Sequence, residues 1–438
     1  MSRVKDVTTS RMQNYLDFRN DPLAFFMKMR NGGEVVSLRT GLQPSFIVNS
    51  PDFVREILVT RDASFKKGRT DKVLRRTIHN GLLTAEKQDH KRQKSYYQPI
   101  FYKERLNSYA KTIVEETKSL VTSLQDVEYC KLNDEMMQLT LAIIAKVMFA
   151  TNVEENKKQL ADAVSDTIEQ TAQTLFTPII LPLAVPTKGN KIHKKAISKL
   201  EDMIYSVLHD AKQHPEKYKM TMVGMLLDTQ DDAGSAIDDE EIRDQMMTML
   251  LAGHETSANL LTWIFYALNQ NSEVEQKLHE EIEMIDLEQS PFELYSKLKY
   301  TQLVIKEALR MYPPAWLIYR ESEEEVELLG ETFKAGSTFM ICSYAIHRNE
   351  EVFPEPEKFK PERFSDQKGE DVPKFAYFPF GGGSRSCIGY KFAIMETTLI
   401  LAILVKKYKF KVEQETVTPD PLVSLRIKEG LKVKVEKR

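Results

Sequence analysis

The chain has 438 residues, of which 42% are hydrophobic and 29% are charged, and its formal net charge is −3. This balance is typical of a globular protein with a large core, and it lacks the basic excess that favours nucleic-acid binding, so we expect no nucleic-acid partner. The polar first 22 residues show neither a signal peptide nor a membrane anchor, so we expect a soluble, cytoplasmic protein.

The chain begins with β-structure and continues mainly as helices. Residues 34–49 are predicted to form a strand, a turn and a second strand, and Ser50-Pro51 then begins a helix. Residues 64–88 are basic, and we expect them to be irregular. From residue 89 to about residue 285, periodic apolar positions predict helices. No linker, low-complexity tract or repeat marks a boundary, so we predict one domain over residues 1–438.

Residues 174–190, TLFTPIILPLAVPTKGN, interrupt the helical pattern. Three prolines exclude a continuous helix, so this segment is predicted to join two helices as an apolar loop. Either the loop is buried, or it forms an apolar mouth for a ligand or a contact with a membrane surface.

The C-terminal half is predicted to contain the longest helix, at residues 238–270, whose acidic start suits the positive end of the helix dipole. The last 30 residues alternate like strands. The fold class is therefore mainly α with minor β. Further helices are predicted at residues 298–311 and 389–406, and strands at residues 326–328, 332–333 and 338–341.

The stretch Phe380 to Gly389, FGGGSRSCIG, is the most unusual in the chain. The three cysteines, Cys130, Cys342 and Cys387, are far apart, so a disulfide framework is not expected. Cys387 precedes a predicted helix, whose dipole favours a thiolate, and a thiolate is a nucleophile or a metal ligand. The glycines let the backbone approach a flat group and direct N–H donors at the sulfur.

These features suggest a heme held through sulfur, although a redox-sensing or nucleophilic cysteine has similar surroundings. Two other motifs are excluded. HETSA at residues 254–258 has Ala258 where a zinc protease has its second histidine, and GGGSRS lacks the Gly-Lys-Ser/Thr of a P-loop.

The loop resembles the heme-binding segment of the cytochrome P-450 superfamily of heme-thiolate monooxygenases. It matches the pattern F-x-x-G-x-R-x-C-x-G at all of its fixed positions, which are Phe380, Gly383, Arg385, Cys387 and Gly389. AGHET at residues 252–256, EALR at residues 307–310 and PERF at residues 361–364 match further family motifs in the expected order. The resemblance covers nearly the whole chain and implies the P-450 fold, a helical bundle around heme with small sheets.

The resemblance implies heme b as the cofactor and Cys387 as the axial ligand of its iron. Lys94 stands where family members usually have arginine. A lysine ammonium cannot form the bidentate hydrogen bonds of a guanidinium. The other residues that the resemblance assigns to the cofactor are Arg385, His90, Arg320, Phe380, Gly389 and Ala252.

The AGHET segment resembles the family's oxygen-binding centre. There the resemblance makes Glu255 and Thr256 the acid–alcohol pair that manages protons during catalysis. Gly253 and Thr256 lie where we expect the helix to open locally, since a threonine hydroxyl competes for backbone carbonyls. His254 is expected to be structural.

Glu307 and Arg310 are three residues apart on one helix face, where an ion pair forms. The resemblance adds Arg363 and implies a buried network that braces the cysteine loop and retains heme, without a part in the chemistry.

The resemblance also implies an apolar substrate, such as a terpenoid, steroid or fatty-acid-like molecule, because the residues at pocket positions are apolar. O₂ is the second substrate. Since the chain ends at Arg438 without a flavin or iron–sulfur domain, we expect electrons from a ferredoxin or flavodoxin with its NAD(P)H reductase. We expect this acidic partner to be attracted by the basic residues Lys87, Lys91, Arg92 and Lys391. The expected pocket residues are Leu83, Leu251, Ala252, Ala315, Trp316 and Leu317.

Two alternative functions are compatible with the same fold. A peroxygenase driven by H₂O₂ often has arginine at the position of Thr256, so the Glu255-Thr256 pair disfavours it. A non-catalytic heme-thiolate sensor would use Cys387 as its ligand and no substrate.

Overall fold

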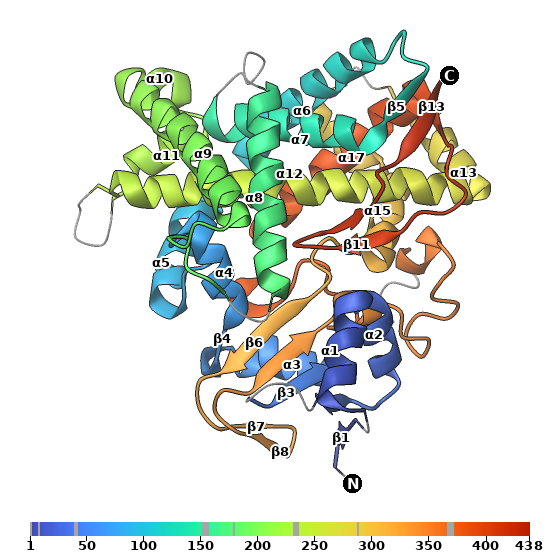
Figure 1. Cartoon of the computed structure of the whole chain (residues 1–438). Helices are drawn as coiled ribbons and strands as arrows, with labels where there is room; N and C mark the ends of the chain where they lie inside the picture. Colours follow the sequence, from blue (N-terminus) through green and yellow to red (C-terminus); the bar gives the residue numbers. More distant parts are fainter. Residues whose placement is uncertain are drawn as a thin grey trace. The chain divides into compact units, whose positions relative to one another are not determined.

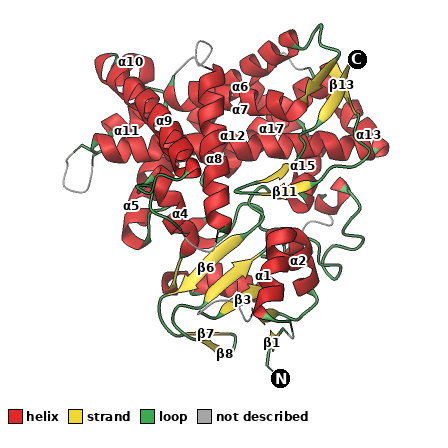
Figure 2. Cartoon of the chain, in the orientation of Figure 1, coloured by secondary structure: helices red, strands yellow, loops and turns green. Residues whose placement is uncertain are grey.

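The computed structural model describes residues 2–7, 9–38, 43–150, 157–177, 180–230, 236–286, 289–365 and 372–438. Contacts divide the chain into two compact units. Unit 1 comprises Met1–Lys72 and Lys306–Cys387, and unit 2 comprises Val73–Ile305 and Ile388–Arg438. Helices dominate the described residues and several small sheets accompany them, which confirms the predicted fold class (Figure 2).

Unit 1 is organised by a six-stranded sheet of order β1-β2-β3-β9-β6-β4. Strand β3 pairs antiparallel with β2, where Val35 faces Val48, and parallel with β9, where Val48 faces Ile341. These β-branched side chains are fully buried and form a core with Phe53 and Phe339, because residues on one face of a pleated strand meet the same neighbours. The strands are β1 (Val4–Asp6), β2 (Val35–Leu38), β3 (Ser45–Val48), β4 (Phe65–Lys66), β6 (Ile318–Ser322) and β9 (Thr338–Ile341), with a separate β7 (Val326–Leu328) and β8 (Glu331–Phe333) hairpin.

Helices α2 and α3 of unit 1 begin at side-chain caps. Asp21 accepts from the backbone N–H of Ala24 at the start of α2, and Ser50 accepts from Asp52 at the start of α3, each followed by proline at the first helical position. The elements are α1 (Arg11–Asn20), α2 (Pro22–Arg30), α3 (Pro51–Arg55), the π-helix η1 (Glu56–Thr60), α16 (Ser343–Ile346), and the 3-10 helices η2 (Asp62–Ser64), η4 (Pro361–Phe364) and η6 (Gly383–Arg385). Helices α4 (Arg69–Ile78) and α15 (Lys299–Met311) each contain a boundary between the unit ranges.

Unit 2 is built around the long helix α12 (Asp239–Gln270), labelled at the centre of the helices in Figure 1. Asp238 caps its first turn, and most of its central residues are buried against α7 and α17. The surrounding helices are α5 (Lys87–Tyr97), α6 (Lys103–Ser123), α7 (Leu132–Phe149), α8 (Lys157–Phe176), α9 (Lys188–Gln213), α10 (Pro215–Tyr218), α11 (Met222–Asp228), α13 (Ser272–Glu283), α14 (Pro291–Lys297) and α17 (Tyr390–Lys407), with the 3-10 helix η3 (Gln98–Phe101).

Two small sheets complete unit 2. Strand β13 (Lys432–Lys437) pairs antiparallel with both β10 (Tyr408–Val412) and β5 (Tyr129–Lys131). The hairpin of β11 (Pro419–Pro421) and β12 (Leu425–Ile427) lies against α12, where the indole of Trp263 donates to the carbonyl of Leu425 at 3.1 Å. This hairpin supplies polar partners to the middle of α12.

Most of the predicted elements agree with the structure, but one prediction is wrong, and one of two alternatives is excluded for part of a loop. The strands of residues 34–49 are present as β2 and β3, while their predicted turn at residues 39–42 lies outside the described residues. The segment 64–88 is not irregular, because it contains α4, whose valine and isoleucine face inward between basic residues. In the 174–190 loop, residues 181–187 are largely exposed, so the buried alternative is wrong for this part.

No helix among the described residues is long and apolar enough to cross a membrane.

Candidate functional site

The cysteine loop of unit 1 is fixed by its backbone. The N–H of Cys387 donates to the carbonyl of Phe380 at 3.0 Å, and the N–H of Ser386 donates to Gly383 at 3.2 Å. Gly383 has a φ of +66°, and a β-carbon there would lie 1.8 Å from the carbonyl oxygen of Leu58 on η1. Only glycine therefore permits this close approach, which packs the loop against η1.

Cys387 differs from the other two cysteines. Its side chain is exposed at the end of the loop, and it forms no disulfide. Burial raises the pKa of the Cys130 and Cys342 thiols to about 12, so neither serves as a thiolate near neutral pH. Of the three, Cys387 is the one that is exposed, so a ligand can reach it most readily.

Unit 1 also contains a buried ion pair between Glu307 and Arg310. The guanidinium of Arg310 donates to both carboxylate oxygens of Glu307, at 2.8 and 2.9 Å, and both side chains are fully buried. Arg363 donates to Glu307 at 3.2 Å, and the N–H of Lys360 donates to the same oxygen at 2.8 Å. The structure thus brings together the three residues that the sequence grouped, and the carboxylate is fully satisfied.

His347 links this ion pair to the cysteine loop and was missed by sequence reasoning. Its carbonyl accepts from Arg310 at 2.9 Å, and its Nε2 accepts the N–H of Phe378 at 3.0 Å. Burial and two nearby arginines lower the pKa of His347 to about 3, so the ring stays neutral and keeps its acceptor. The carbonyl of Phe378 in turn accepts from Gly381, which begins the glycine run.

Two arginines of unit 1 were predicted to meet the cofactor. Arg320 lies on β6 with its side chain buried, and it donates to the carbonyl of Tyr319 at 2.9 Å. Arg385 ends η6, two residues before Cys387, and is half-buried, as is Phe380. The loop therefore presents an aromatic ring, a cation and a thiol within eight residues.

In unit 2, α12 carries the predicted acid–alcohol pair. The helix is α-helical without interruption through AGHET, so the expected local opening is absent. The hydroxyl of Thr256 donates to the carbonyl of Ala252 at 3.0 Å, a bond that an intact helix accommodates. A β-carbon on Gly253 would lie 2.9 Å from Cδ1 of Ile144, so this glycine permits the close packing of α7.

The middle of α12 has one open face and one buried polar face. Ala252 is exposed and Thr256 is half-buried, whereas Glu255 is only 3% exposed. Burial raises the pKa of Glu255 to about 6, against the opposing effects of Ser424, Arg426 and Asn259. Glu255 is thus directed toward the β11–β12 hairpin, and within the described residues it makes no hydrogen bond to Thr256.

His254 has a structural role in this segment. Its Nδ1 is 2.8 Å from the carbonyl of Leu250, and burial lowers its pKa to about 4. Its own carbonyl accepts from Thr140 of α7 at 3.0 Å. These contacts hold α12 against α7.

Glu396 of α17 is a second buried acid that sequence reasoning missed. It is fully buried, and its Oε2 lies 2.5 Å from the hydroxyl of Ser257, next to Thr256. Its Oε1 has no hydrogen-bond partner, and burial raises its pKa to about 8. The signal was present in the sequence, because this glutamate stands alone in the apolar run of residues 392–405.

The remaining predicted residues fall into two groups by exposure. His90 is buried and Lys94 is half-buried, four residues apart on α5 in unit 2. Trp316 packs edge-on against Phe26 in the core of unit 1, which leaves it no open surface. The other pocket residues, Leu83, Leu251, Ala252, Ala315 and Leu317, are half-buried or exposed, and Gly389 is half-buried at the start of α17.

The predicted basic patch is weaker than its sequence suggests. Arg92 is held by Asp89 at 2.8 Å and by Glu241 at 3.1 Å, so its charge is neutralised. Lys87, Lys91 and Lys391 are exposed.

The residues of the loop fit a heme held through sulfur. The donor set offers an exposed thiol on a backbone that is pinned in place, with glycines where a side chain would collide and arginines within the same unit. Binding of heme through sulfur requires an accessible sulfur atom, a backbone without side chains that would block the flat ring, and cations that pair with the propionates.

Comparison with known proteins gives a consistent result. The family model described as Cytochrome P450 matches residues 8–435. The chain is 31% identical to cyclooctatin synthase of Streptomyces melanosporofaciens over 92% of its length and 89% of that protein. It is 30% identical to cyclooctat-9-en-7-ol 5-monooxygenase of the same organism, with coverage of 89% and 85%, and 30% identical to pentalenene oxygenase of Streptomyces avermitilis, with coverage of 90% and 88%.

The close approach of Gly383 to Leu58 leads to a stability prediction. Gly383→Ala combines a positive φ with a backbone collision, so we expect it to lower the free energy of unfolding by about 4 kcal/mol or more. Gly330→Ala is the matched control, because Gly330 has a φ of +86° with nothing within 4 Å of a β-carbon. That variant is expected to lose only about 1–2 kcal/mol. Urea unfolding of both proteins measures the difference, and equal losses would contradict the proposed role of Gly383.

Proposed function

Because the chain belongs to the cytochrome P450 family of monooxygenases, we propose that it hydroxylates an apolar, terpenoid-like substrate at a heme b bound through Cys387. The observation that carries this proposal is the exposed Cys387 thiol on a glycine loop that is fixed through His347 to the buried Glu307–Arg310 pair. The terpenoid class is supported by the names of the relatives, two of which specify a terpenoid as the molecule that they oxidise.

Each proposed cofactor residue has a distinct task. Cys387 would hold the heme iron through its sulfur, and the buried network of Glu307, Arg310 and Arg363 would support the loop that carries it. Arg320, Arg385, His90 and Lys94 are the proposed partners of the heme propionates, with Lys94 giving a single point of contact in place of a guanidinium fork. When bound, the heme activates O₂ so that one oxygen atom enters the substrate and the other leaves as water.

The chain's own acids and alcohols are proposed to manage the protons that this reaction consumes. The Thr256 hydroxyl uses its hydrogen on Ala252, so its lone pairs are left to accept a hydrogen bond from a water at the open face of α12. Glu255, with a pKa of about 6, is mostly ionised at pH 7 and takes up a proton as the pH falls toward 6. Because the Glu255 side chain is directed toward the β11–β12 hairpin, we propose that water carries its proton to the open face of α12.

The substrate contacts are proposed to be apolar. Leu83, Leu251 and Ala252 belong to unit 2, and Ala315 and Leu317 belong to unit 1. Their exposure supports a part in ligand binding, while Trp316 is assigned to the core. Apolar side chains of this kind recognise shape and hydrophobic area and give little selection for charged groups.

The electron donor is proposed to be an acidic ferredoxin or flavodoxin with its NAD(P)H reductase. The exposed Lys87, Lys91 and Lys391 of unit 2 support this choice, since exposed cations steer an acidic partner. Arg92 is left out of this surface because Asp89 and Glu241 already hold it.

The proposed activity is tested with ¹⁸O₂. The heme-loaded protein, with NAD(P)H, a ferredoxin and its reductase, should incorporate a single ¹⁸O atom into a terpenoid. Pentalenene and cyclooctat-9-en-7-ol are the first probes, and a steroid and a fatty acid are the comparison. Efficient turnover with H₂O₂ alone would favour a peroxygenase instead. Absence of any turnover, with a Soret band that responds to no ligand, would favour a sensor.

The role of Thr256 is tested by Thr256→Ala, which removes the hydroxyl from the open face of α12. We expect product formed per NAD(P)H to fall at least about tenfold and peroxide release to rise, because proton delivery is impaired. Thr256→Ser should restore coupling. The matched control is Thr262→Ala, because Thr262 makes the same type of bond, to Ala258 at 2.8 Å, in a buried position. Unchanged coupling in Thr256→Ala would remove Thr256 from the mechanism.

A further inference from the structure

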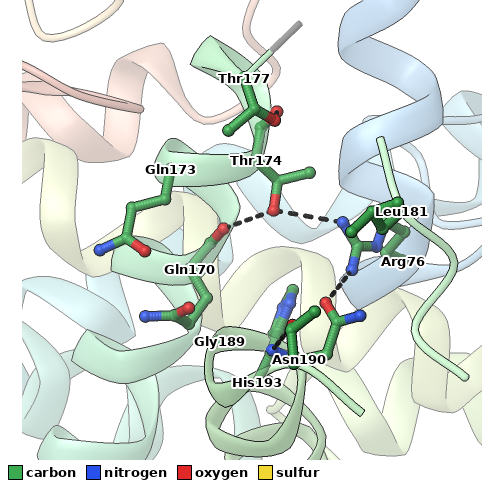
Figure 3. Close-up of a pocket in the computed structure, with 10 residues that line it drawn as sticks. Arg76, Gln170, Gln173, Thr174, Thr177, Leu181, Gly189, Asn190 and His193 are labelled. Atoms are coloured by element: carbon green, nitrogen blue, oxygen red, sulfur yellow. Dashed lines mark hydrogen bonds between the residues drawn. The ribbon is translucent and has the colours of Figure 1, made fainter. Parts of the chain in front are cut away.

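A polar cavity of about 160 Å³ lies in unit 2, between α4, α8 and the first turns of α9 (Figure 3). It is lined mainly by hydroxyl and amide side chains, with Leu181 as an aliphatic residue at its wall. None of these residues belongs to the proposed heme or oxygen site. Those that bear on its chemistry are Arg76, Gln170, Thr174, Thr177, Asn190 and His193.

Arg76 is a cation in this cavity without a carboxylate partner among the described residues. Its guanidinium donates to the hydroxyl of Thr174 at 3.2 Å and to the side-chain oxygen of Asn190 at 2.8 Å, and both groups are neutral (Figure 3). Its Nε is buried and has no hydrogen-bond partner. Burial alone lowers the pKa of Arg76, since no neighbouring acid offsets the loss of hydration. An arginine held this way has a positive charge that no carboxylate in the described part of the chain neutralises, and an anion in the cavity can match that charge.

The other described residues that line the cavity include no second arginine or lysine and no acidic residue. His193 is buried, and its Nε2 is 2.9 Å from the hydroxyl of Thr77. Burial, with a contribution from Arg76, lowers its pKa to about 4, so the ring is neutral at pH 7. The N-terminal turn of α9, capped by Thr187, contains no acidic residue, so the positive end of this 26-residue helix is not neutralised by its own side chains.

We propose that this cavity binds the carboxylate group of an amphiphilic ligand. A single guanidinium matches one negative charge, and its planar fork matches the two oxygens of a carboxylate. The side-chain amide of Gln170 lies at the wall and can donate a further hydrogen bond, whereas the hydroxyls of Thr174 and Thr177 already donate to the backbone carbonyls of Gln170 and Thr174. Leu181 is 45% exposed and begins the apolar segment of residues 181–185, which provides a surface for an aliphatic tail beside the charged head. The site goes beyond the proposed hydroxylation and does not depend on heme chemistry.

Calorimetric titration of the heme-loaded protein with sodium decanoate tests this site. Arg76→Gln is expected to weaken decanoate binding at least about tenfold, which is the loss of one charge-assisted interaction. Lys191→Gln is the matched control, because it removes an exposed charge from the same turn of α9 without touching the cavity wall. 1-Decanol, which has the same chain without the charge, should bind the wild type and Arg76→Gln equally. The Soret band is recorded in parallel, so a response of the heme pocket is distinguished from binding at Arg76.

Gln170→Glu keeps Arg76 and its contacts, so it tests the site even where Arg76→Gln unfolds. A carboxylate at residue 170 supplies the missing anion from the protein itself, and we expect it to weaken decanoate binding at least about tenfold. Equal decanoate affinity in the wild type and in Gln170→Glu would overturn the proposal. Displacement of decanoate by an equal concentration of inorganic phosphate would also overturn it, because the site would then select multiply charged anions.

Discussion

The buried ion pair of Glu307 and Arg310 is the constraint on which unit 1 depends. Two charges without solvent are stable only when each is fully hydrogen-bonded, and removal of one partner from such a pair costs about 3–5 kcal/mol. Here the carboxylate is held by Arg310, Arg363 and the N–H of Lys360, while Arg310 also binds the carbonyls of His347 and Pro356. The pair therefore fixes the backbone of residues 347–360 in place.

That fixed backbone determines where the cysteine loop begins. His347 stays neutral because it is buried beside arginines, and its ring accepts the N–H of Phe378. The turn from Phe378 to Gly381 and the approach of Gly383 to Leu58 then leave the Cys387 side chain exposed. The buried network thus supports the position of the proposed iron ligand.

Unit 2 contains two buried acids, Glu255 on α12 and Glu396 on α17. Glu396 has a raised pKa of about 8 and is mostly protonated at pH 7, whereas Glu255, at about 6, is mostly ionised. Glu255 directly precedes Thr256 in α12, and Glu396 of α17 accepts a hydrogen bond from Ser257, the residue that follows Thr256. Their different protonation states at the same pH are compatible with the proposed role of this segment in proton handling.

The sequence predicted the family, the main helices and the grouping of Glu307 with Arg310 and Arg363, because these depend on fixed motifs and local spacing. It did not predict His347 or Glu396 as site residues, since their importance comes from burial and from partners 31 and 139 residues away. Helix α4 was missed because its two inward apolar residues are diluted by charged neighbours. The local opening of α12 was wrongly expected, because the competing hydroxyl of Thr256 bonds a carbonyl without breaking the helix. The proposed roles of Cys387, Thr256 and the pocket residues remain predictions.

The most direct test of the account is iron K-edge X-ray absorption of the purified ferric protein. The wild type and Cys342→Ser should each show a single sulfur atom at bonding distance from iron, and Cys387→His should show none. A wild-type iron without a sulfur neighbour, or a sulfur that persists in Cys387→His, would contradict the assignment of Cys387 as the heme ligand.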